Sequence, residues 1–297
     1  MVCMIVIGVT ADYGLGSRIA EHMGAKYCRF FSKVFPDGES YLRLDENVRG
    51  EDVLLVQSMA EQQDKRFTEM LMAIDAIAEA HANNIYGLIP YMAYARQDRR
   101  FLDGEPISAR SVLGALHNAG MSKLAVIEPH KEEELSYFKG KSIAIDVMKK
   151  VVRGAVEKTG AETLVAPDSG VSGRVKGVAE ELGVGWDYLE KKRDRNNGSL
   201  SIGKGLGDLS GKKILVVDDM ISTGGTIVQA SGEALSKGAV GINAAAVHLI
   251  LADGAYGRIK NAGVGNIFGS NSTGSKGCEM IDVSEDVAAA LSPFLVD

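Results

Sequence analysis

The sequence predicts an α/β fold made of two similarly built domains, each a mainly parallel sheet flanked by helices. Three observations lead to this prediction: short apolar segments alternate with amphipathic ones, glycine is abundant, and one stretch of each half follows the same pattern. Glycine accounts for 35 of the 297 residues, above the usual ~7% of protein sequences. This excess suits a fold with many tight turns between strands and helices.

Eight short apolar runs have the character of buried strands. In chain order they read "MIVIGV", "DVLLVQS", "IYGLIPYM", "KLAVIEP", "TLVAPD", "KKILVVDD", "INAAAVHLIL" and "NIFGS". Amphipathic segments separate them, and in residues 67–80 one helical face collects Phe67, Met70, Leu71, Ile74, Ile77 and Ala78. This alternation predicts a mainly parallel sheet covered on both sides. Such sheets bind ligands beyond the carboxyl ends of their strands, so the residues after each apolar run are the functional candidates.

An internal repeat is indicated by residues 114–130, "GALHNAGMSKLAVIEPH", and 232–248, "GEALSKGAVGINAAAVH". Both read without a gap as helix end, glycine turn, apolar strand and terminal histidine. Each follows a strand, a polar loop and a helix start, "LIPYMAYARQDRR" in the first half and "ILVVDDMISTGGT" in the second. The pattern predicts two domains, residues 1–145 and 146–297.

The composition is that of a soluble globular protein large enough for two ordinary domains, with 297 residues, 45% hydrophobic and 24% charged. The net charge of −6 and the pI of about 5.5 argue against a general nucleic-acid partner. A local basic cluster, Arg96, Arg99 and Arg100, can still bind a small anion. An acidic protein with basic pockets fits an enzyme that acts on a metabolite.

The cysteines and the apolar runs bear on location. Cys3, Cys28 and Cys278 are far apart and odd in number, so we expect neither a disulfide framework nor a zinc site, and we expect a reducing cytoplasm. The N-terminal "MVCMIVIGVTA" lacks a basic region and is predicted to be a first strand, not a signal peptide. No apolar run reaches the ~18 residues of a membrane span, so no membrane partner is expected.

The stretch "ILVVDDMISTGGT", residues 214–226, carries the strongest chemical signal. The loop from Met220 leads into a helix predicted to begin near Thr226, and its small residues allow backbone N–H groups to point at an anion. The cradle residues are Ser222, Thr223, Gly224, Gly225 and Thr226. Asp218 and Asp219 precede it, where carboxylates can accept hydrogen bonds from sugar hydroxyls. The alternative is an ordinary turn with a helix cap; the spacing of a nucleotide P-loop is absent.

"VVDDMISTGGT" resembles the phosphoribosyl diphosphate loop of type I phosphoribosyltransferases and of ribose-phosphate diphosphokinases. Further motifs resemble the diphosphokinases in order along nearly the whole chain: "FPDGES" at 35–40, "PYMAYARQDRRF" at 90–101, "GEPIS" at 104–108, "EPH" ending at 130, "APDSG" at 166–170 and "EKKR" at 190–193. The resemblance implies two phosphoribosyltransferase-like domains. It also implies transfer of a diphosphoryl group from MgATP to the 1-hydroxyl of ribose 5-phosphate, giving 5-phosphoribosyl 1-diphosphate and AMP.

The resemblance places ATP in the N-terminal domain. Phe35, Asp37 and Glu39 match the positions that contact adenine, and Arg96 and Gln97 match a loop that binds polyphosphate oxygens. A guanidinium beside an amide binds such oxygens directionally. Without the family, "FPDGES" reads as a Pro-Asp-Gly turn in a hairpin, and the arginines read as a solvated loop.

The resemblance also assigns a catalytic group and a metal. His130 matches a histidine near the triphosphate with its magnesium, and Asp168 fits a ligand of Mg²⁺, which prefers a few carboxylates with phosphate oxygens and water. Lys191 and Arg193 match a catalytic basic pair. As the alternatives, a lone histidine at a strand end is often structural, and "EKKRDRNNGS" can be a solvated hairpin tip.

The resemblance implies a homo-oligomer, because in this family "FPDGES" of one subunit meets the ATP site of another. Two competing functions use the same loop: a phosphoribosyltransferase, and a non-catalytic relative that regulates. Two departures from familiar members are Ser222, where an acidic residue is common, and Glu128-Pro129-His130, where "DLH" is common. They leave regulation by phosphate or ADP open.

Overall fold

The computed structural model describes residues 4–193, 200–274 and 277–296, apart from the side chains of residues 191–204. The chain forms two compact units. Unit 1 comprises Met1–Val147, Asn271–Gly274 and Val283–Asp297, and unit 2 comprises Met148–Ser270 and Ser275–Asp282.

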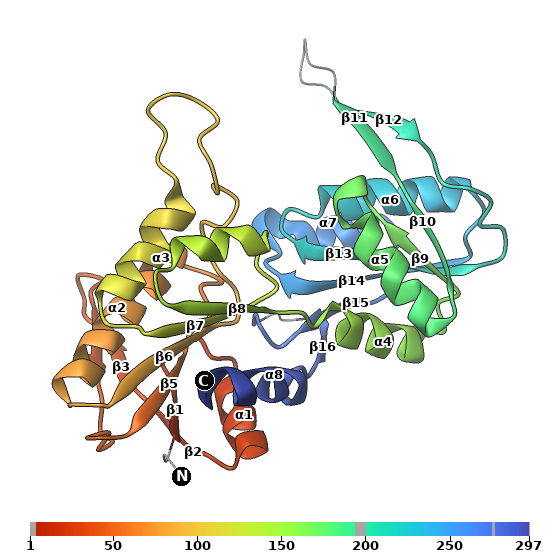
Figure 1. Cartoon of the computed structure of the whole chain (residues 1–297). Coiled ribbons are helices and arrows are strands. Elements are labelled where there is room, and N and C mark those ends of the chain that lie inside the picture. The colour runs from red at the N-terminus through yellow and green to blue at the C-terminus, as the bar shows by residue number, and fades with distance from the viewer. Residues whose placement is uncertain (1–3, 194–199, 275–276, 297) are drawn as a thin grey trace. The chain divides into compact units, whose positions relative to one another are not determined.

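Unit 1 contains a parallel sheet, a separate hairpin and the helices that cover the sheet (Figure 1). Its elements are β1 (Met4–Gly8), α1 (Leu15–Met23), β2 (Lys26–Arg29), β3 (Phe31–Val34), β4 (Ser40–Arg43), β5 (Asp52–Val56), α2 (Gln63–Glu79), β6 (Asn84–Ile89), α3 (Ser108–Asn118), β7 (Lys123–Ile127), the 3-10 helix η1 (Glu132–Tyr137), β8 (Lys141–Ile145) and α8 (Ser284–Val296). The sheet order is β2-β1-β5-β6-β7-β8, and every pair is parallel.

Unit 2 has the same plan. Its elements are α4 (Met148–Thr159), β9 (Thr163–Ala166), α5 (Ser169–Leu182), β10 (Gly185–Tyr188), β11 (Glu190–Arg193), β12 (Leu200–Lys204), β13 (Lys213–Ile221), α6 (Gly225–Ser236), β14 (Gly241–Leu249), the 3-10 helix η2 (Ala252–Gly254), α7 (Ala255–Asn261), β15 (Ile267–Ser270) and β16 (Glu279–Ile281). The sheet order is β10-β9-β13-β14-β15-β16, again parallel throughout.

The two sheets therefore share one topology. In each, an antiparallel hairpin is inserted between the second and third sheet strands of the chain, β3–β4 in unit 1 and β11–β12 in unit 2. The predicted α/β class with two similar, mainly parallel sheets is confirmed. The hairpin that carries "FPDGES" and the hairpin that begins with "EKKR" occupy equivalent places in the two units.

The register predicted for the repeat was wrong by one strand–helix step. The alignment of residues 114–130 with 232–248 pairs β7 with β14, whereas the strand orders make β14 the equivalent of β6 and β15 the equivalent of β7. Helix, glycine turn and buried strand recur in many steps of such a fold. An alignment with few identities can therefore slide by one step.

The last helix packs away from the strand that precedes it. α8 follows β16 of unit 2 yet belongs to unit 1, where it packs on α1, β7 and β8. Its apolar stripe of Val287, Leu291 and Leu295 is buried there, at the i, i+4 and i+8 spacing of one helical face. A single division between residues 145 and 146 assigns α8 to the second domain instead.

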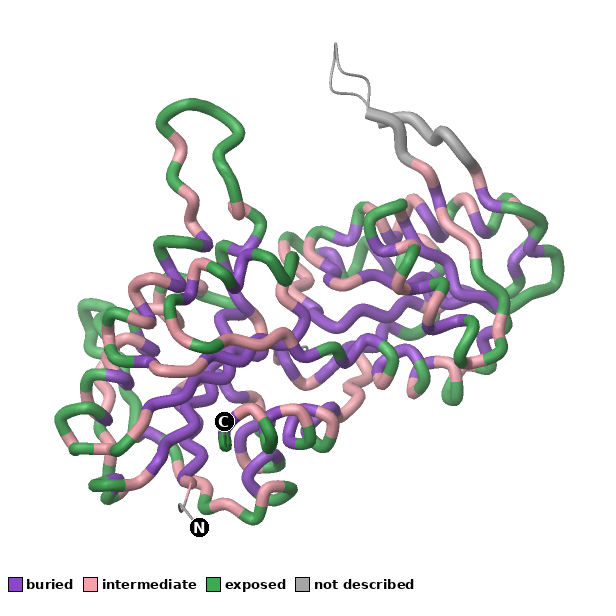
Figure 2. The backbone as a smooth tube through the Cα atoms, viewed as in Figure 1, coloured by how far each residue is buried: buried purple, intermediate pink, exposed green. Residues whose placement is uncertain are grey.

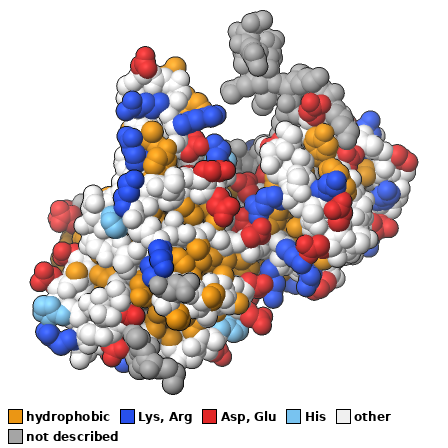
Figure 3. Space-filling view, in the orientation of Figure 1, with side chains coloured by type: hydrophobic (Ala, Val, Ile, Leu, Met, Phe, Trp, Pro, Cys, Tyr) orange, Lys and Arg blue, Asp and Glu red, His pale blue; other side chains and the backbone are white. Residues whose placement is uncertain are grey.

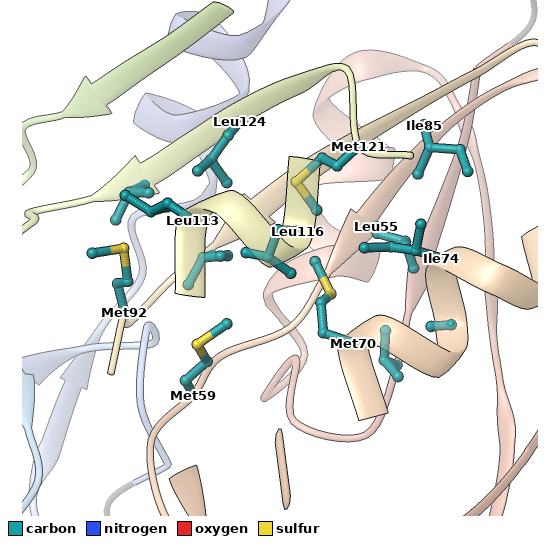
Figure 4. Close-up of a cluster of buried hydrophobic side chains, with 14 of the residues drawn as sticks. Leu55, Met59, Met70, Ile74, Ile85, Met92, Leu113, Leu116, Met121 and Leu124 are labelled. Carbon is teal, nitrogen blue, oxygen red and sulfur yellow. The ribbon is translucent and has the colours of Figure 1, made fainter. Parts of the chain in front are cut away.

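The core of unit 1 lies between its sheet and the helices α2 and α3, with labelled side chains of all three meeting in Figure 4. Met70, Ile74 and Ile77 of α2 are fully buried, as the helical pattern predicts. Ala78 is exposed and Ala73 is buried instead, because Ala78 lies at the edge of that face. Each large apolar side chain buried in this way contributes about 1.5–3 kcal/mol.

A second core forms on the sheet of unit 2 around Val216, Ile227 and Ala244. The central strands of both sheets are buried along their length (Figure 2). In the described part of the chain, every helix is too short or too polar to span a bilayer.

Candidate active site

The segment predicted to bind a phosphate lies between β13 and α6. β13 continues through Ile221, so Asp218 and Asp219 lie among the last residues of the strand and not in the loop after it. Gly224 caps α6 with a φ of 77°, the left-handed region that favours glycine. A Cβ there would lie 2.8 Å from Ile259 Cδ1. The loop thus requires glycine at this position, and the helix begins with backbone N–H groups that have no partner within the helix.

The carbonyl groups of the same loop are held by the segment after β14. The Ser222 carbonyl accepts from the Ala252 N–H at 3.0 Å, and the Thr223 carbonyl accepts from Arg258 Nη2 at 2.9 Å. Leu251 and Asp253 adopt positive φ angles of 48° and 51° in that segment. These contacts to its carbonyls hold the loop in one conformation.

Two other carboxylates of unit 2 act on the buried carboxyl of Asp218. Asp218 is buried, with 8% of its surface exposed, and it accepts from the Asp219 N–H at 3.0 Å and from Thr226 Oγ1 at 3.4 Å. Asp168 caps α5 by accepting from the Gly170 N–H at 2.8 Å. Burial, reinforced by Asp219 and Asp168, raises the pKa of Asp218 to about 8. This crowding favours a ligand that brings hydroxyl donors or positive charge.

The tip of the β3–β4 hairpin carries the residues predicted to contact adenine. It is a tight turn in which the Phe35 N–H donates to the Glu39 carbonyl at 2.8 Å and the Gly38 N–H donates to the Phe35 carbonyl at 2.9 Å. Asp37 accepts from the Glu39 N–H at 3.2 Å. The Phe35 ring is 39% exposed and lies edge-on to Tyr41. The turn expected from "FPDGES" is present, and Lys33 Nζ lies over the partly exposed Phe35 ring, 4.6 Å from its centroid.

Arg96 and Gln97 lie on the long loop between β6 and α3. Arg96 is exposed, and Lys and Arg side chains gather on this projecting loop (Figure 3). The Gln97 side-chain oxygen accepts from the Ser108 hydroxyl, so Gln97 also fixes the loop to the start of α3. Asp98 is held by Lys131 and by Tyr137, whose hydroxyl donates to the Asp98 carbonyl at 2.9 Å. The loop is therefore anchored directly after Arg96.

His130 is exposed just beyond β7. Glu128, two residues before it, is buried and has a φ of 44°. Its Oε1 accepts from the Val147 N–H at 2.9 Å, which ties the end of β7 to the chain after β8. Glu128, which stands where "DLH" has aspartate, thus fixes the backbone two residues before His130 through its side chain.

Lys191 and Arg193 lie in β11, opposite Ile202 and Leu200 of β12. Their side chains lie outside the described part of the structure, as does all of Cys3. Among the described residues, no three or more His, Cys, Asp or Glu side chains are grouped so as to hold a metal ion.

Strained backbone gathers after the strands of both sheets. Of the eight non-glycine residues with positive φ in the described part of the chain, seven follow a sheet strand. These are Tyr13 after β1, Glu61 and Gln62 after β5, Tyr94 after β6, Glu128 after β7, and Leu251 and Asp253 after β14. Such conformations cost of order 1–3 kcal/mol each and cluster at functional sites.

Comparisons with known proteins identify the family of the chain. Residues 4–120 match the model of the N-terminal domain of ribose phosphate pyrophosphokinase, and residues 136–262 match that of the phosphoribosyl transferase domain. The ribose-phosphate pyrophosphokinase of Saccharolobus solfataricus is 40% identical over 291 residues, 97% of this chain and 100% of the relative. That of Sulfurisphaera tokodaii is 41% identical over 290 residues, 96% of this chain and 99% of the relative.

The chain belongs to the ribose-phosphate pyrophosphokinase family.

A solved structure supports this at the level of the fold. The phosphoribosylpyrophosphate synthetase from Mycobacterium smegmatis has a TM-score of 0.85 and 27% identity, with 99% of each chain covered. The resemblance found in the sequence is therefore confirmed, and so is the prediction that the chain is an enzyme of the ribose-phosphate pyrophosphokinase family.

One residue that contacts the loop between β13 and α6 was not predicted from the sequence. Arg258 of α7 donates to the Thr223 carbonyl of the loop. Arg258 lies 35 residues after Thr223 in the chain and belongs to none of the motifs described above. Only the fold brings it to the loop, so sequence patterns alone gave no signal for it.

The buried carboxyl of Glu134 in η1 predicts a dependence of stability on pH. Its Oε1 accepts from the Lys131 N–H at 3.3 Å, but its buried Oε2 has no hydrogen-bond partner among the described residues. Burial raises the pKa of Glu134 from 4.5 to about 7. Since the folded pKa lies above the unfolded one, the stability that this group contributes is complete below pH 4.5 and lost as the pH rises through about 7.

Glu134→Gln is therefore expected to raise the free energy of unfolding at pH 8 by roughly 1 kcal/mol, because glutamine cannot acquire the charge that burial disfavours. Urea unfolding at pH 5 and pH 8 measures the free energy of unfolding, which should increase in the variant at pH 8 only. Glu133→Gln, at the exposed neighbouring position, is the control and should leave the free energy of unfolding unchanged at both pH values. An equal effect of Glu134→Gln at both pH values would contradict the assignment.

Proposed function

We propose that this enzyme transfers the diphosphoryl group of MgATP to the 1-hydroxyl of ribose 5-phosphate, giving 5-phosphoribosyl 1-diphosphate and AMP. The observation that carries the proposal is the segment from Asp218 to Thr226. It joins a buried carboxyl, Asp218, to a loop that is held in place through its carbonyls and leads into the N-terminus of α6. A sugar phosphate has hydroxyls at one end and a phosphate at the other. The segment offers acceptors and donors in the same order.

In this proposal Asp218 and Asp219 accept hydrogen bonds from the ribose hydroxyls, and the amides of Ser222 to Thr226 bind the 5-phosphate. The 1-hydroxyl is left free to attack the β-phosphorus of ATP. The bond from that phosphorus to the oxygen retained by AMP breaks, so AMP leaves, the proton of the 1-hydroxyl is released to solvent, and no covalent enzyme intermediate forms. Positioning and charge neutralisation supply most of the catalysis of such transfers.

ATP is assigned to residues of unit 1. The exposed Phe35 ring offers a stacking face, and Asp37 and Glu39 offer acceptors for the amine of adenine. Arg96 offers a directional cation for polyphosphate oxygens. Lys191 and Arg193 of the hairpin in unit 2 are proposed to neutralise charge on the transferring group and to exclude water.

The residues of this chain also fit Mg²⁺. Carboxylate oxygens are the ligands that this ion prefers, and a cation favours the charged form of Asp218, whose pKa is raised by burial and by its neighbouring carboxylates. We propose Asp168 in unit 2 as one ligand and, separately, His130 in unit 1 as a group near the ion that accompanies ATP. When bound, Mg²⁺ neutralises phosphate oxygens.

We also propose a cytoplasmic homo-oligomer, with nucleic acids and membranes playing no part. The β3–β4 hairpin supports self-association, because Phe31, Val34 and Phe35 are 45%, 54% and 39% exposed. Sedimentation that showed a fully active monomer would refute the oligomer.

The reaction is tested by incubating the purified protein with MgATP and ribose 5-phosphate and measuring AMP. AMP should form only when both substrates are present. A phosphoribosyltransferase would instead consume 5-phosphoribosyl 1-diphosphate together with a base, and a non-catalytic relative would do neither. Either of these results would refute the proposed reaction.

The loop conformation leads to a prediction for ribose 5-phosphate. Gly224→Ala is expected to raise its KM about tenfold or more, because the new Cβ is strained at a φ of 77° and meets Ile259. The KM for ATP should stay within twofold. Gly232→Ala in the same helix, where a Cβ meets nothing within 4 Å, is the matched control. Equal KM values for both variants would contradict a role for the loop.

A further inference from the structure

A buried polar cluster in unit 1 surrounds the carboxylate of Glu69 in α2. Glu69 is only 2% exposed. Its Oε1 accepts from the Ser40 hydroxyl at 2.9 Å. Its Oε2 accepts from Arg66 Nη1 at 3.0 Å, from Gln57 Nε2 at 3.3 Å and from the Thr10 hydroxyl. A carboxylate can only accept, and here every contact is a donor.

The donors come from different parts of unit 1. Ser40 is the first residue of β4, directly after Glu39 at the hairpin tip. Thr10 follows β1, and Gln57 follows β5. The Gln57 side-chain oxygen in turn accepts from the N–H groups of Thr10 at 3.0 Å and Ala11 at 2.8 Å. Glu69 therefore joins the hairpin to the loops that leave two central strands of the sheet.

The carboxylate is held in its charged form. Burial acts to raise the pKa of Glu69, but hydrogen bonds from Thr10, Ser40 and Arg66 outweigh it and the pKa is lowered. Hydrogen bonds to a charged group are stronger than those between neutral groups. The Ser40 contact is thus a firm attachment and not an incidental surface contact.

The hairpin has few other attachments near its tip. β3 and β4 pair only with each other among the described strands, and residues 31–39 are all exposed. Leu42 packs on the core of unit 1 two positions further along β4. Among these contacts, the Ser40–Glu69 hydrogen bond is nearest in sequence to Phe35, Asp37 and Glu39.

We propose that Glu69, acting through Ser40, is a positioning residue that sets the β3–β4 hairpin for nucleotide binding. The inference rests on the proposed function, which assigns the hairpin tip to adenine. Glu69 itself does not touch the nucleotide. Its loss should therefore weaken the use of ATP while the use of ribose 5-phosphate is unchanged.

The first arm of the test needs no substrate. Hydrogen exchange of the Phe35 and Gly38 amides, both hydrogen-bonded within the tip, reports how firmly the hairpin is held. Ser40→Ala should speed their exchange about tenfold, because it removes one bond to a charged group, and Ser40→Thr should restore it. Ser32→Ala, at an exposed position of β3, is the matched control and should leave exchange unchanged.

The second arm is steady-state kinetics. Ser40→Ala and Glu69→Gln should raise the KM for ATP about tenfold, with kcat and the KM for ribose 5-phosphate within twofold of the wild type. Ser40→Ala keeps the test decisive if Glu69→Gln fails to fold, since it leaves the other three donors of Glu69 in place. A KM for ATP equal to that of Ser32→Ala would overturn the positioning role, and so would an equal rise in both KM values.

The two arms separate the possible failures. A wild type that makes no AMP refutes the proposed reaction. Unchanged exchange at the hairpin tip in Ser40→Ala refutes the anchor, whatever the reaction is.

Discussion

Replacing Asp218 and Asp219 together by asparagine is expected to weaken ribose 5-phosphate binding at least ~100-fold. Hydrogen bonds to a charged group contribute about 1.5–3 kcal/mol each, and both carboxylates are proposed to accept from ribose hydroxyls. Asparagine keeps the shape but loses the charge and presents a donor at one of the two positions. Calorimetric titration with ribose 5-phosphate at a pH above 8, where Asp218 is charged, measures the loss directly.

At a pH above 8, the same double variant should be more resistant to urea than the wild type when no ligand is present. Burial and the neighbouring Asp219 and Asp168 disfavour charge on Asp218, so removing the charge removes repulsion. Asp208→Asn, at an exposed site in the same unit, is the control and should leave ribose 5-phosphate binding unchanged. Binding within twofold of the wild type in the double variant would contradict the proposed role of the pair.

Replacing Lys191 and Arg193 together by alanine is expected to lower kcat about 10³-fold with both substrates still bound. Cations that neutralise a transferring phosphoryl group typically contribute 10³–10⁵ in rate, and they act mainly in the transition state. Rapid-quench measurement of AMP gives the turnover, and equilibrium titration gives the dissociation constants of ATP and ribose 5-phosphate.

Lys192→Ala is the matched control, because it removes one positive charge from the same strand, β11. It should keep most of the activity. Turnover of the Lys191→Ala, Arg193→Ala variant equal to that of the wild type would remove the pair from the mechanism. If the variant lost substrate binding and kept its turnover, Lys191 and Arg193 would act in binding the substrates and not in the transition state.

The sequence was sufficient for the fold class because the strands are short, apolar and buried on both faces. Runs such as "KKILVVDD" therefore stand out without any alignment. The turn between β13 and α6 was also predictable, since a left-handed turn at Gly224 followed by a helix start leaves a local signature. Both features depend on residues that are near each other in the chain.

The features that were missed depend on contacts between distant residues. Arg258 reaches the Thr223 carbonyl, and Glu69 reaches Ser40, only after the sheets have formed. The return of α8 to unit 1 depends on which sheet offers an apolar face, and an amphipathic pattern does not say which partner it will cover. The repeat slipped by one step because each strand and turn resembles the next.

The reaction itself is tested most directly by phosphorus nuclear magnetic resonance of a mixture of the protein, MgATP and ribose 5-phosphate. ATP should be replaced by equal amounts of AMP and a diphosphate carried on a sugar phosphate, with no ADP. Formation of ADP would show transfer of a single phosphoryl group, and ATP that stays unchanged would show no transfer. Either result would contradict the assignment of this chain as a diphosphoryl transferase.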